Sequence, residues 1–377
     1  MSRVWNAHVV YVPTSLMNNH CHNSIPISMI KITRKVYISR NYKKLDCGGS
    51  IARTDIETVM DRLGFVNIGL PQSVCHNGIY HGIKNYVSYR KALRSIRPGD
   101  MIVLQYPMKI GFDEICGVSH KKGAKIVCLI HDLSSFREKT LTPEEEICRL
   151  NQCDVLLTHN HRMREWLSSH GCRVKMIDYE IMDYIHGASG KAHEVVDRNY
   201  SLFYVGDLSP ATYGYIYDLA RIMPQRDIYL YGHSPSEDLL AELPNLHFEG
   251  FAKDTDLMKS HKGDFGLSWY GTSLDFGIGK IGEYMEYNNP HKISLYFRCN
   301  SPVVVWSKGG RAKFIKDNHL GICVDSLRNL ESRLSMITAD EYREMVGNVE
   351  RVNERLKNGR YLEDVLQQAE QYLLKQT

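Results

Sequence analysis

Four consecutive residues in the second half of the chain combine a helix start with two basic side chains. They are Asn289, Pro290, His291 and Lys292. Asn is a favoured N-cap and Pro suits the first helical position, so the run predicts a helix that begins here. Cations in a first turn oppose the helix dipole, whereas an anion would bind the free backbone N–H groups. The run therefore indicates a phosphate site, although an ordinary surface helix with a solvated lysine gives the same pattern.

A second pair of reactive side chains follows an apolar run in the first half of the chain. His131 and Asp132 come directly after residues 125–130 (KIVCLI). Ligands of parallel α/β sheets bind beyond the carboxyl ends of the strands. An imidazole or carboxylate there can accept the proton of an attacking hydroxyl, so either residue is a candidate general base. Asp132 can equally cap the next helix, and His131 can be a histidine of the core.

Glycines follow three apolar runs in the second half. The runs 201–205, 227–231 and 263–269 lead into Gly206, Gly232 and Tyr270-Gly271. A glycine at a strand end lets a ligand approach the backbone closely, but such glycines are also common in any α/β domain. Residues 274–282 (LDFGIGKIG) form a glycine-rich loop in which Lys280 is available to a phosphate.

These residues need a scaffold in which strands and helices alternate, and the apolar patterns predict one. Strands are expected at 35–39, 65–68, 101–105, 125–130 and 155–158, and in a second series at 201–205, 227–231, 246–248, 263–269, 303–306 and 320–324. Strands alternating with helical patterns predict parallel sheets. Two amphipathic helices are expected at 340–357 and 361–375.

The length of the chain and a polar stretch at 186–198 predict two α/β domains. We expect an N-terminal extension at 1–31, a first domain at 32–185, a linker at 186–198, a second domain at 199–337 and C-terminal helices at 338–377. The extension lacks the long apolar segment and cleavage site of a signal peptide, and we expect it to be poorly ordered. Its His20, Cys21 and His22 could ligate a metal only with a second cluster, which the sequence lacks.

The overall composition is that of a globular protein. Of 377 residues, 43% are hydrophobic and 24% are charged, and the formal net charge is +4. This charge, without a dense basic run, argues against a nucleic-acid partner. No apolar stretch is long enough to span a bilayer. The ten cysteines are scattered without a recurring CxxC pair, as is typical of free thiols in a reducing cytoplasm.

The segment NNPHKISLYFRCNSPVVVW, residues 288–306, resembles a segment of the bacterial β-1,6-galactofuranosyltransferases and of the related glucosyltransferases that glycosylate serine-rich adhesins. QYP (105–107) and IHDLSSFR (130–137) also resemble this family, and the similarity extends from about Lys35 to Leu330. It implies a GT-B glycosyltransferase, with two Rossmann-like domains that face a cleft. It also implies that the second domain holds most of the nucleotide sugar and that the last helices cross back to the first domain.

The resemblance assigns expected roles to individual residues. Tyr231 and Lys292 occupy positions that contact the diphosphate or base in the family, and Gly206, Asn289, His291, Lys280 and Tyr270 are expected around the same donor. Gly49, Ser50 and Tyr106 are expected on the acceptor side, although Gly48-Gly49 also reads as a tight turn before a helix. The chain departs from the family at two places. Many relatives have GNL where this chain has Gly206-Asp207-Leu208, and an acidic WDG where it has Trp269-Tyr270-Gly271. The missing carboxylate at Tyr270 bears on which donor sugar is bound, because the resemblance implies that this loop lies near the sugar ring.

The predicted function is transfer of a hexose (galactofuranose, glucose or galactose) from a UDP-sugar to a glycan hydroxyl, in cell-surface polysaccharide or glycoprotein synthesis. The acceptor would be lipid-linked or protein-linked, and the enzyme would work in the cytoplasm or at the inner face of the membrane. No DxD-like acidic pair ends a strand, so we expect neither metal nor cofactor. A sugar-nucleotide epimerase and a non-catalytic binding subunit are the alternatives. Self-association and peripheral membrane contact are compatible with the sequence.

Overall fold

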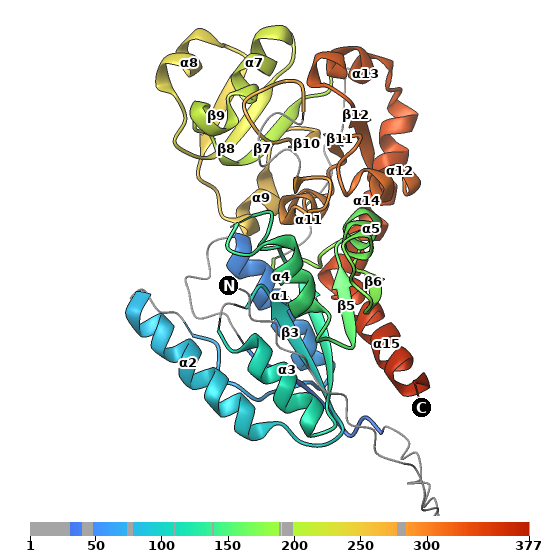
Figure 1. Cartoon of the computed structure of the whole chain (residues 1–377). Coiled ribbons are helices and arrows are strands. Elements are labelled where there is room, and N and C mark those ends of the chain that lie inside the picture. The colour runs from blue at the N-terminus through green and yellow to red at the C-terminus, as the bar shows by residue number, and fades with distance from the viewer. Residues whose placement is uncertain are drawn as a thin grey trace, which may run out of the picture.

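The chain forms two α/β domains, one above the other in Figure 1, and each is built on a six-stranded sheet. The computed structural model describes residues 31–39, 48–73, 78–108, 110–137, 139–187, 190, 199–276 and 284–376. Lys280 and the His20, Cys21 and His22 cluster lie outside these residues. Within the described part of the chain, no helix is both long and apolar enough to cross a bilayer.

The first sheet is entirely parallel, as the alternating pattern predicts. Its order is β2-β1-β3-β4-β5-β6, with β1 (Arg34–Tyr37), β2 (Val66–Asn67), β3 (Asp100–Tyr106), β4 (Lys125–Ile130), β5 (Val155–Thr158) and β6 (Lys175–Asp178). Its helices are α1 (Gly48–Arg62), α2 (Gly78–Ser95), α3 (Phe112–Lys121), α4 (Pro143–Leu150) and α5 (His161–Ser169). Every residue of β3 is buried, which explains its unbroken apolar run.

The second sheet is also parallel and has the strand order that dinucleotide-binding folds share, β12-β11-β10-β7-β8-β9. Its strands are β7 (Leu202–Asp207), β8 (Ile228–His233), β9 (Leu246–Gly250), β10 (Phe265–Ser268), β11 (Val303–Trp306) and β12 (Gly321–Val324). Its helices are α6 (Pro210–Tyr213), α7 (Tyr215–Ile222), α8 (Glu237–Glu242), α9 (Asp254–Ser260), α11 (His291–Arg298), α12 (Ala312–Asp317), the 3₁₀ turn η1 (Leu327–Asn329) and α13 (Leu330–Met336). The order of the strands reverses between β7 and β10, where such sheets bind ligands.

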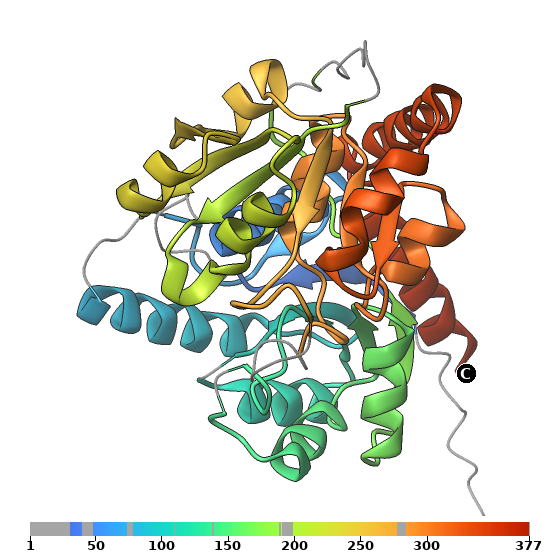
Figure 2. The same cartoon turned by 90° about the horizontal axis from the view of Figure 1, so that it is seen from above.

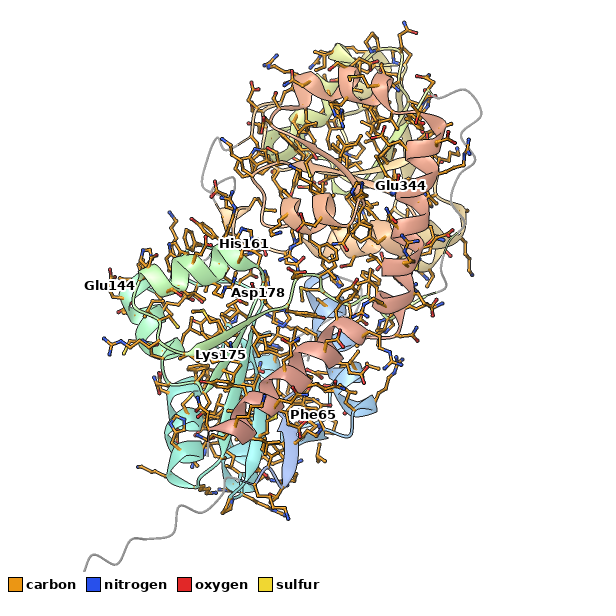
Figure 3. The ribbon with its side chains drawn as sticks, turned by 90° about the vertical axis from the view of Figure 1, so that its right-hand side faces the viewer. Phe65, Glu144, His161, Lys175, Asp178 and Glu344 are labelled. Carbon is orange, nitrogen blue, oxygen red and sulfur yellow. The ribbon has the colours of Figure 1, made fainter. Side chains whose placement is uncertain are left out.

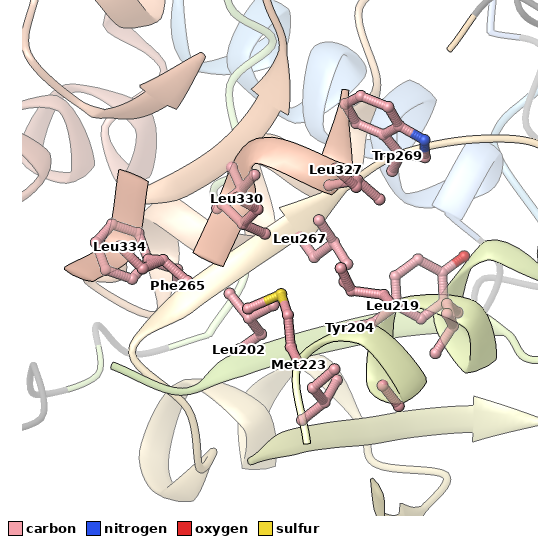
Figure 4. Close-up of a cluster of buried hydrophobic side chains, with 14 of the residues drawn as sticks. Leu202, Tyr204, Leu219, Met223, Phe265, Leu267, Trp269, Leu327, Leu330 and Leu334 are labelled. Carbon is pink, nitrogen blue, oxygen red and sulfur yellow. The ribbon is translucent and has the colours of Figure 1, made fainter. Parts of the chain in front are cut away.

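One face of this second sheet carries a large apolar core. Figure 4 shows Leu202, Phe265 and Leu267 of the sheet meeting Leu330 and Leu334 of α13, and all five are completely buried. Burying such a side chain stabilises a fold by about 1.5–3 kcal/mol. The core therefore holds the strands whose carboxyl ends form the site described below.

The last two helices join the domains. α14 (Ala339–Lys357) packs on α11, and Arg298 and Asn353 form a buried hydrogen bond between them. α15 (Arg360–Lys375) packs on the first domain, and Figure 3 shows it passing between Lys175 and Phe65. Asp183, on the segment that leaves the first domain, accepts a hydrogen bond from the Leu362 N–H at 2.7 Å. The helix that carries Lys292 is thus braced by helices that contact both domains.

Candidate nucleotide-sugar site

A cleft of about 600 Å³ lies between the two domains at the carboxyl ends of their strands. Its first-domain residues include Arg53, His131, Asp132 and Arg137. Its second-domain residues include Gly206, Tyr231, Phe251, Tyr270, Asn289, His291 and Lys292. Eight of the residues predicted from the sequence therefore border one cavity, although they lie in separate parts of the chain.

Lys292 is the main cation on the second-domain side. Its ammonium group donates a hydrogen bond to the Tyr204 hydroxyl at 3.1 Å and lies 4.2 Å from the centre of that ring. The rings of Tyr270 and Tyr213 lie 5.1 and 5.8 Å away. Among the described residues no carboxylate pairs with Lys292, so its charge is balanced only by aromatic faces and one hydroxyl.

This environment changes the acidity of Lys292. Burial lowers its pKa from 10.5 to about 7, because aromatic rings solvate an ammonium ion less well than water does. An anion in the cleft would favour the charged form and raise the pKa again. The lysine is therefore suited to bind a negatively charged ligand and to take up a proton as it does so.

The start of α11 differs by one residue from the prediction. The N-cap is Pro290, with φ −63° and ψ 115°, and no side chain caps the helix. The prediction of Asn289 as the N-cap was therefore wrong, because the extended backbone of Pro290 already ends the helix. Asn289 is 4% exposed, and neither its amide oxygen nor its amide nitrogen has a hydrogen-bond partner. Uncapped backbone N–H groups and an unsatisfied amide thus border the cleft beside Lys292.

His291 connects the same helix to the first domain. Its Nε2 lies 3.2 Å from the carbonyl oxygen of Asp183, and its ring stacks on Tyr184 with the centroids 4.6 Å apart. Burial lowers the pKa of His291, so its neutral form is favoured. A neutral ring that donates to a carbonyl positions α11 without adding a second charge.

Two neighbouring strands of the second sheet end in glycines. Gly206 and Gly232 are paired across β7 and β8 and have φ values of 150° and 156°. A Cβ on Gly232 would lie 1.7 Å from the Gly206 carbonyl oxygen. Glycine is therefore required at position 232 by the sheet itself, and the resulting bare backbone lets a ligand approach closely.

An aromatic surface lies beside these glycines. Tyr231 is buried, and its hydroxyl accepts a hydrogen bond from the Lys262 N–H at 2.8 Å. Phe251 is 58% exposed and stacks on His233, with the ring centroids 4.6 Å apart and the planes inclined by 16°. An exposed flat ring inside a cleft is suited to stack on a nucleobase. Sequence reasoning missed Phe251, because it lies in a loop without a distinctive motif.

On the first-domain side, a chain of hydrogen bonds orients His131. Its Nε2 lies 2.7 Å from Oε1 of Gln105, and Nε2 of Gln105 lies 3.4 Å from the buried carboxylate of Glu57. The carboxylate can only accept, so Gln105 turns its oxygen towards the ring, and the proton of neutral His131 lies on Nε2. The lone pair of the imidazole is then on Nδ1.

Asp132 has different surroundings. Its Oδ1 accepts a hydrogen bond from the Tyr284 hydroxyl at 3.0 Å and lies 3.4 Å from a guanidinium nitrogen of Arg137. Tyr284 belongs to the second half of the chain, so this bond links the domains. Arg137 is 58% exposed on its side chain and faces the cleft. It was missed as a single residue, although the IHDLSSFR segment that ends in it was recognised.

Of the three residues expected on the acceptor side, Gly49 and Ser50 lie together at the start of α1, and Tyr106 lies in the core of the first domain. Gly48 and Gly49 open α1 rather than forming a turn before it, and Ser50 is buried beside Ile51, which does border the cleft. Tyr106 is 1% exposed, and its hydroxyl donates to Glu146 at 2.8 Å. Its expected position on the acceptor side is therefore corrected. Side chains alternate along β3, so Gln105 reaches His131 while Tyr106 enters the core beneath α3 and α4.

The described residues contain no group of three or more His, Cys, Asp or Glu side chains that could hold a metal ion. The carboxylates that border the cleft are Asp132, Asp207 and Asp254. Asp132 has Tyr284 and Arg137 as partners, and Asp254 accepts a hydrogen bond from the Tyr184 hydroxyl. The charges that the cleft offers a phosphate are thus those of Lys292 and the arginines.

The chain matches two sequence models of one family. Residues 35–181 match the Glucosyltransferase 3-like N-terminal domain, and residues 202–369 match the Glucosyltransferase 3-like C-terminal domain. The chain is 26% identical over 329 residues to beta-1,6-galactofuranosyltransferase WbbI of Escherichia coli K12, covering 87% of this chain and 96% of that protein. It is also 26% identical over 326 residues to glucosyltransferase 3 of Streptococcus gordonii, covering 84% and 92%.

Solved structures share the fold at low sequence identity. The lipopolysaccharide outer core galactosyltransferase WaaB in its apo form has a TM-score of 0.57 and 11% identity, covering 88% of this chain and 98% of that one. A putative UDP-N-acetylglucosamine 2-epimerase from Listeria monocytogenes has a TM-score of 0.52 and 10% identity, covering 89% and 95%. The expected GT-B fold is confirmed. Because transferases and an epimerase share it, the fold alone does not identify the reaction.

Proposed function

Because the chain belongs to the Glucosyltransferase 3-like family of glycosyltransferases, we propose that it transfers a hexose from a UDP-sugar to a hydroxyl of a glycan acceptor without a divalent metal. The observation that carries the proposal is the start of α11. There an ammonium without a carboxylate partner, an unsatisfied buried amide and an uncapped helix end meet in one cleft. A diphosphate has the charge and the acceptor oxygens that these groups lack.

In this proposal the two halves of the donor have separate binding surfaces. The diphosphate lies on Lys292, the backbone N–H groups of α11 and the Asn289 amide, with Arg137 facing it across the cleft. The base stacks on Phe251 beyond the bare strand ends at Gly206 and Gly232. Fixed positive groups at the leaving diphosphate stabilise the charge that develops as the glycosidic bond breaks.

The acceptor enters from the first-domain side. The imidazole of His131 accepts the proton of the attacking hydroxyl, and Gln105, which is itself held by Glu57, fixes the orientation of the ring. Oδ1 of Asp132 accepts a hydrogen bond from the Tyr284 phenol and lies within ion-pair distance of the Arg137 guanidinium, so this oxygen already has two partners. We therefore assign to Asp132 the orientation of Arg137 and the contact with the second domain.

The epimerase alternative shares the fold but receives no support from the two sequence relatives described above, which are named as transferases. The binding-subunit alternative predicts nucleotide binding without turnover. A transferase should release UDP from the donor at a rate that rises when a suitable glycan acceptor is added. An epimerase should convert the nucleotide sugar without any acceptor.

The donor class is tested by thermal unfolding in a panel of nucleotides. UDP and UDP-hexoses at about 100 times their dissociation constant should stabilise the protein by about 2.7 kcal/mol, while CMP and GDP should have much smaller effects. A chelator should leave the UDP effect unchanged. Preference for another nucleotide would contradict the UDP assignment, and a UDP effect that needs magnesium would contradict the metal-free mechanism.

Donor binding should also depend on pH through Lys292. With a pKa of about 7 in the free protein, the ammonium is increasingly deprotonated above pH 7, and a bound diphosphate must restore its proton. The affinity for UDP should therefore fall by up to about tenfold per pH unit between pH 7.5 and 9, where the phosphate of UDP is already ionised. Calorimetry in buffers of different ionisation enthalpy should detect proton uptake on binding. Proton release, or an affinity constant over this range, would contradict the assigned role.

A further inference from the structure

The outer face of α2 exposes an apolar stripe that the donor site does not explain. Ile79, Tyr80, Ile83, Tyr86 and Val87 are 78%, 60%, 55%, 52% and 46% exposed. Their spacing of three or four residues places Ile79, Ile83, Tyr86 and Val87 on one side of the helix. Figures 1 and 2 show α2 at the periphery of the first domain, with its N-terminal end projecting beyond the sheet. Ordinary helices of a globular domain turn such a stripe inward.

The charges of α2 are all of one sign. Its sequence contains Lys84, Arg90, Lys91 and Arg94 and no acidic residue. Arg90 and Arg94 continue the apolar stripe along the same face. A groove of about 460 Å³ there is lined by Tyr86, Val87, Arg90, Lys91, Arg94 and Ser95. The nearest acidic partner is Glu114 of α3, which lies 3.5 Å from Arg90, and both side chains are about half exposed.

We propose that this face of α2 binds the surface of an anionic lipid bilayer. An interfacial helix inserts apolar side chains to the depth of the acyl boundary and keeps its cations among the headgroups, and α2 offers both on one face. Charge distinguishes this partner from a second copy of the chain. A twofold contact between two α2 helices would bring the cations of both copies together and repel them.

The topology places this surface beside the cleft. Because the first sheet is parallel, the chain leaves β2 at its carboxyl edge and α2 returns to the opposite edge. The exposed N-terminal half of α2 therefore lies at the edge where His131 borders the cleft. If the proposed transferase function holds, a bilayer here would present a lipid-linked acceptor to the catalytic edge. Bilayer binding itself does not depend on that function.

The experiment is co-sedimentation of the full-length protein with vesicles. The protein should bind vesicles of equal parts phosphatidylglycerol and phosphatidylcholine at low salt, and should bind phosphatidylcholine vesicles much more weakly. The double variant Ile83→Gln, Tyr86→Gln should reduce partitioning on the order of tenfold. The double variant Arg90→Gln, Arg94→Gln should reduce it about fivefold for each cation removed. Salt should weaken the binding of the wild-type protein.

Controls separate this surface from general effects. Met336 is 66% exposed on the second domain, so Met336→Gln removes a comparable apolar side chain elsewhere and should bind like the wild type. UDP affinity should be unchanged in every variant, which distinguishes failure of this proposal from failure of the donor site. Equal binding to both vesicle types, no binding, or unaltered binding by the α2 variants would overturn the proposal. So would self-association that the Ile83→Gln, Tyr86→Gln variant abolishes while vesicles bind no protein.

Discussion

Replacing His131 with alanine is expected to lower kcat by on the order of 10²–10⁴-fold, the usual contribution of a general base. The affinity for UDP should change less than twofold, because the imidazole borders the cleft from the first domain, where we propose that the acceptor binds. The measurement is steady-state release of UDP from the donor in the presence of acceptor, together with UDP binding by calorimetry. The combination of lost turnover and retained binding is specific to a group that acts on the acceptor.

Two further variants serve as a control and a comparison for His131→Ala. His161→Ala removes a histidine at the start of α5, beyond the residues that border the cleft, and should leave kcat unchanged. Asp132→Asn should reduce kcat less than His131→Ala does, since the amide retains an oxygen that can accept from Tyr284. A larger loss in Asp132→Asn than in His131→Ala would move the role of base to the carboxylate. Normal kcat in His131→Ala would remove the histidine from the mechanism.

Replacing Lys292 with methionine is expected to weaken UDP binding by about 1.5–3 kcal/mol, the range of a charge-assisted hydrogen bond, or roughly 10- to 150-fold. Methionine keeps the length and the contacts with Tyr204 and Tyr270 but carries no charge. The pH dependence of UDP affinity between pH 7.5 and 9 should disappear with it. Calorimetric titration over this range measures both effects.

The same variant should not destabilise the free protein. A pKa lowered to about 7 means that folding disfavours the ammonium, so an apolar side chain in its place should leave the unfolding midpoint unchanged or higher. The matched control is Lys262→Met, since Lys262 lies 5.7 Å from the centre of the Tyr229 ring but pairs with Glu249. It should leave UDP affinity unchanged. A Lys292→Met protein that binds UDP normally would remove Lys292 from the donor site.

The interplay of binding and stability explains why a lysine is useful here. In the free protein its charge is poorly compensated, and binding of an anion supplies the missing partner. In the proposed function, the free energy with which a diphosphate binds therefore includes relief of the unfavourable environment that folding creates for the ammonium. The same reasoning applies to the unsatisfied amide of Asn289.

Much of the scaffold was readable from the chain because the signals are local. Buried parallel strands give continuous apolar runs such as 125–130, and their carboxyl ends follow directly in the sequence. His131, Gly206 and Lys292 were predicted in this way, the last with help from the family resemblance, and all three border the cleft. Even the error at Asn289 was small, since Pro290 ends the same helix one residue later.

The surroundings of the side chains at the cleft could not be predicted from the sequence. Both faces of the first sheet are covered, so the apolar pattern did not tell which of Gln105 and Tyr106 turns towards His131. The bond between Tyr284 and Asp132 joins residues 152 positions apart, and the rings around Lys292 come from separate segments. Backbone preference and burial are encoded in short runs of residues. The pKa of Lys292, the tautomer of His131 and the exposure of α2 depend on groups that meet only after the chain has folded.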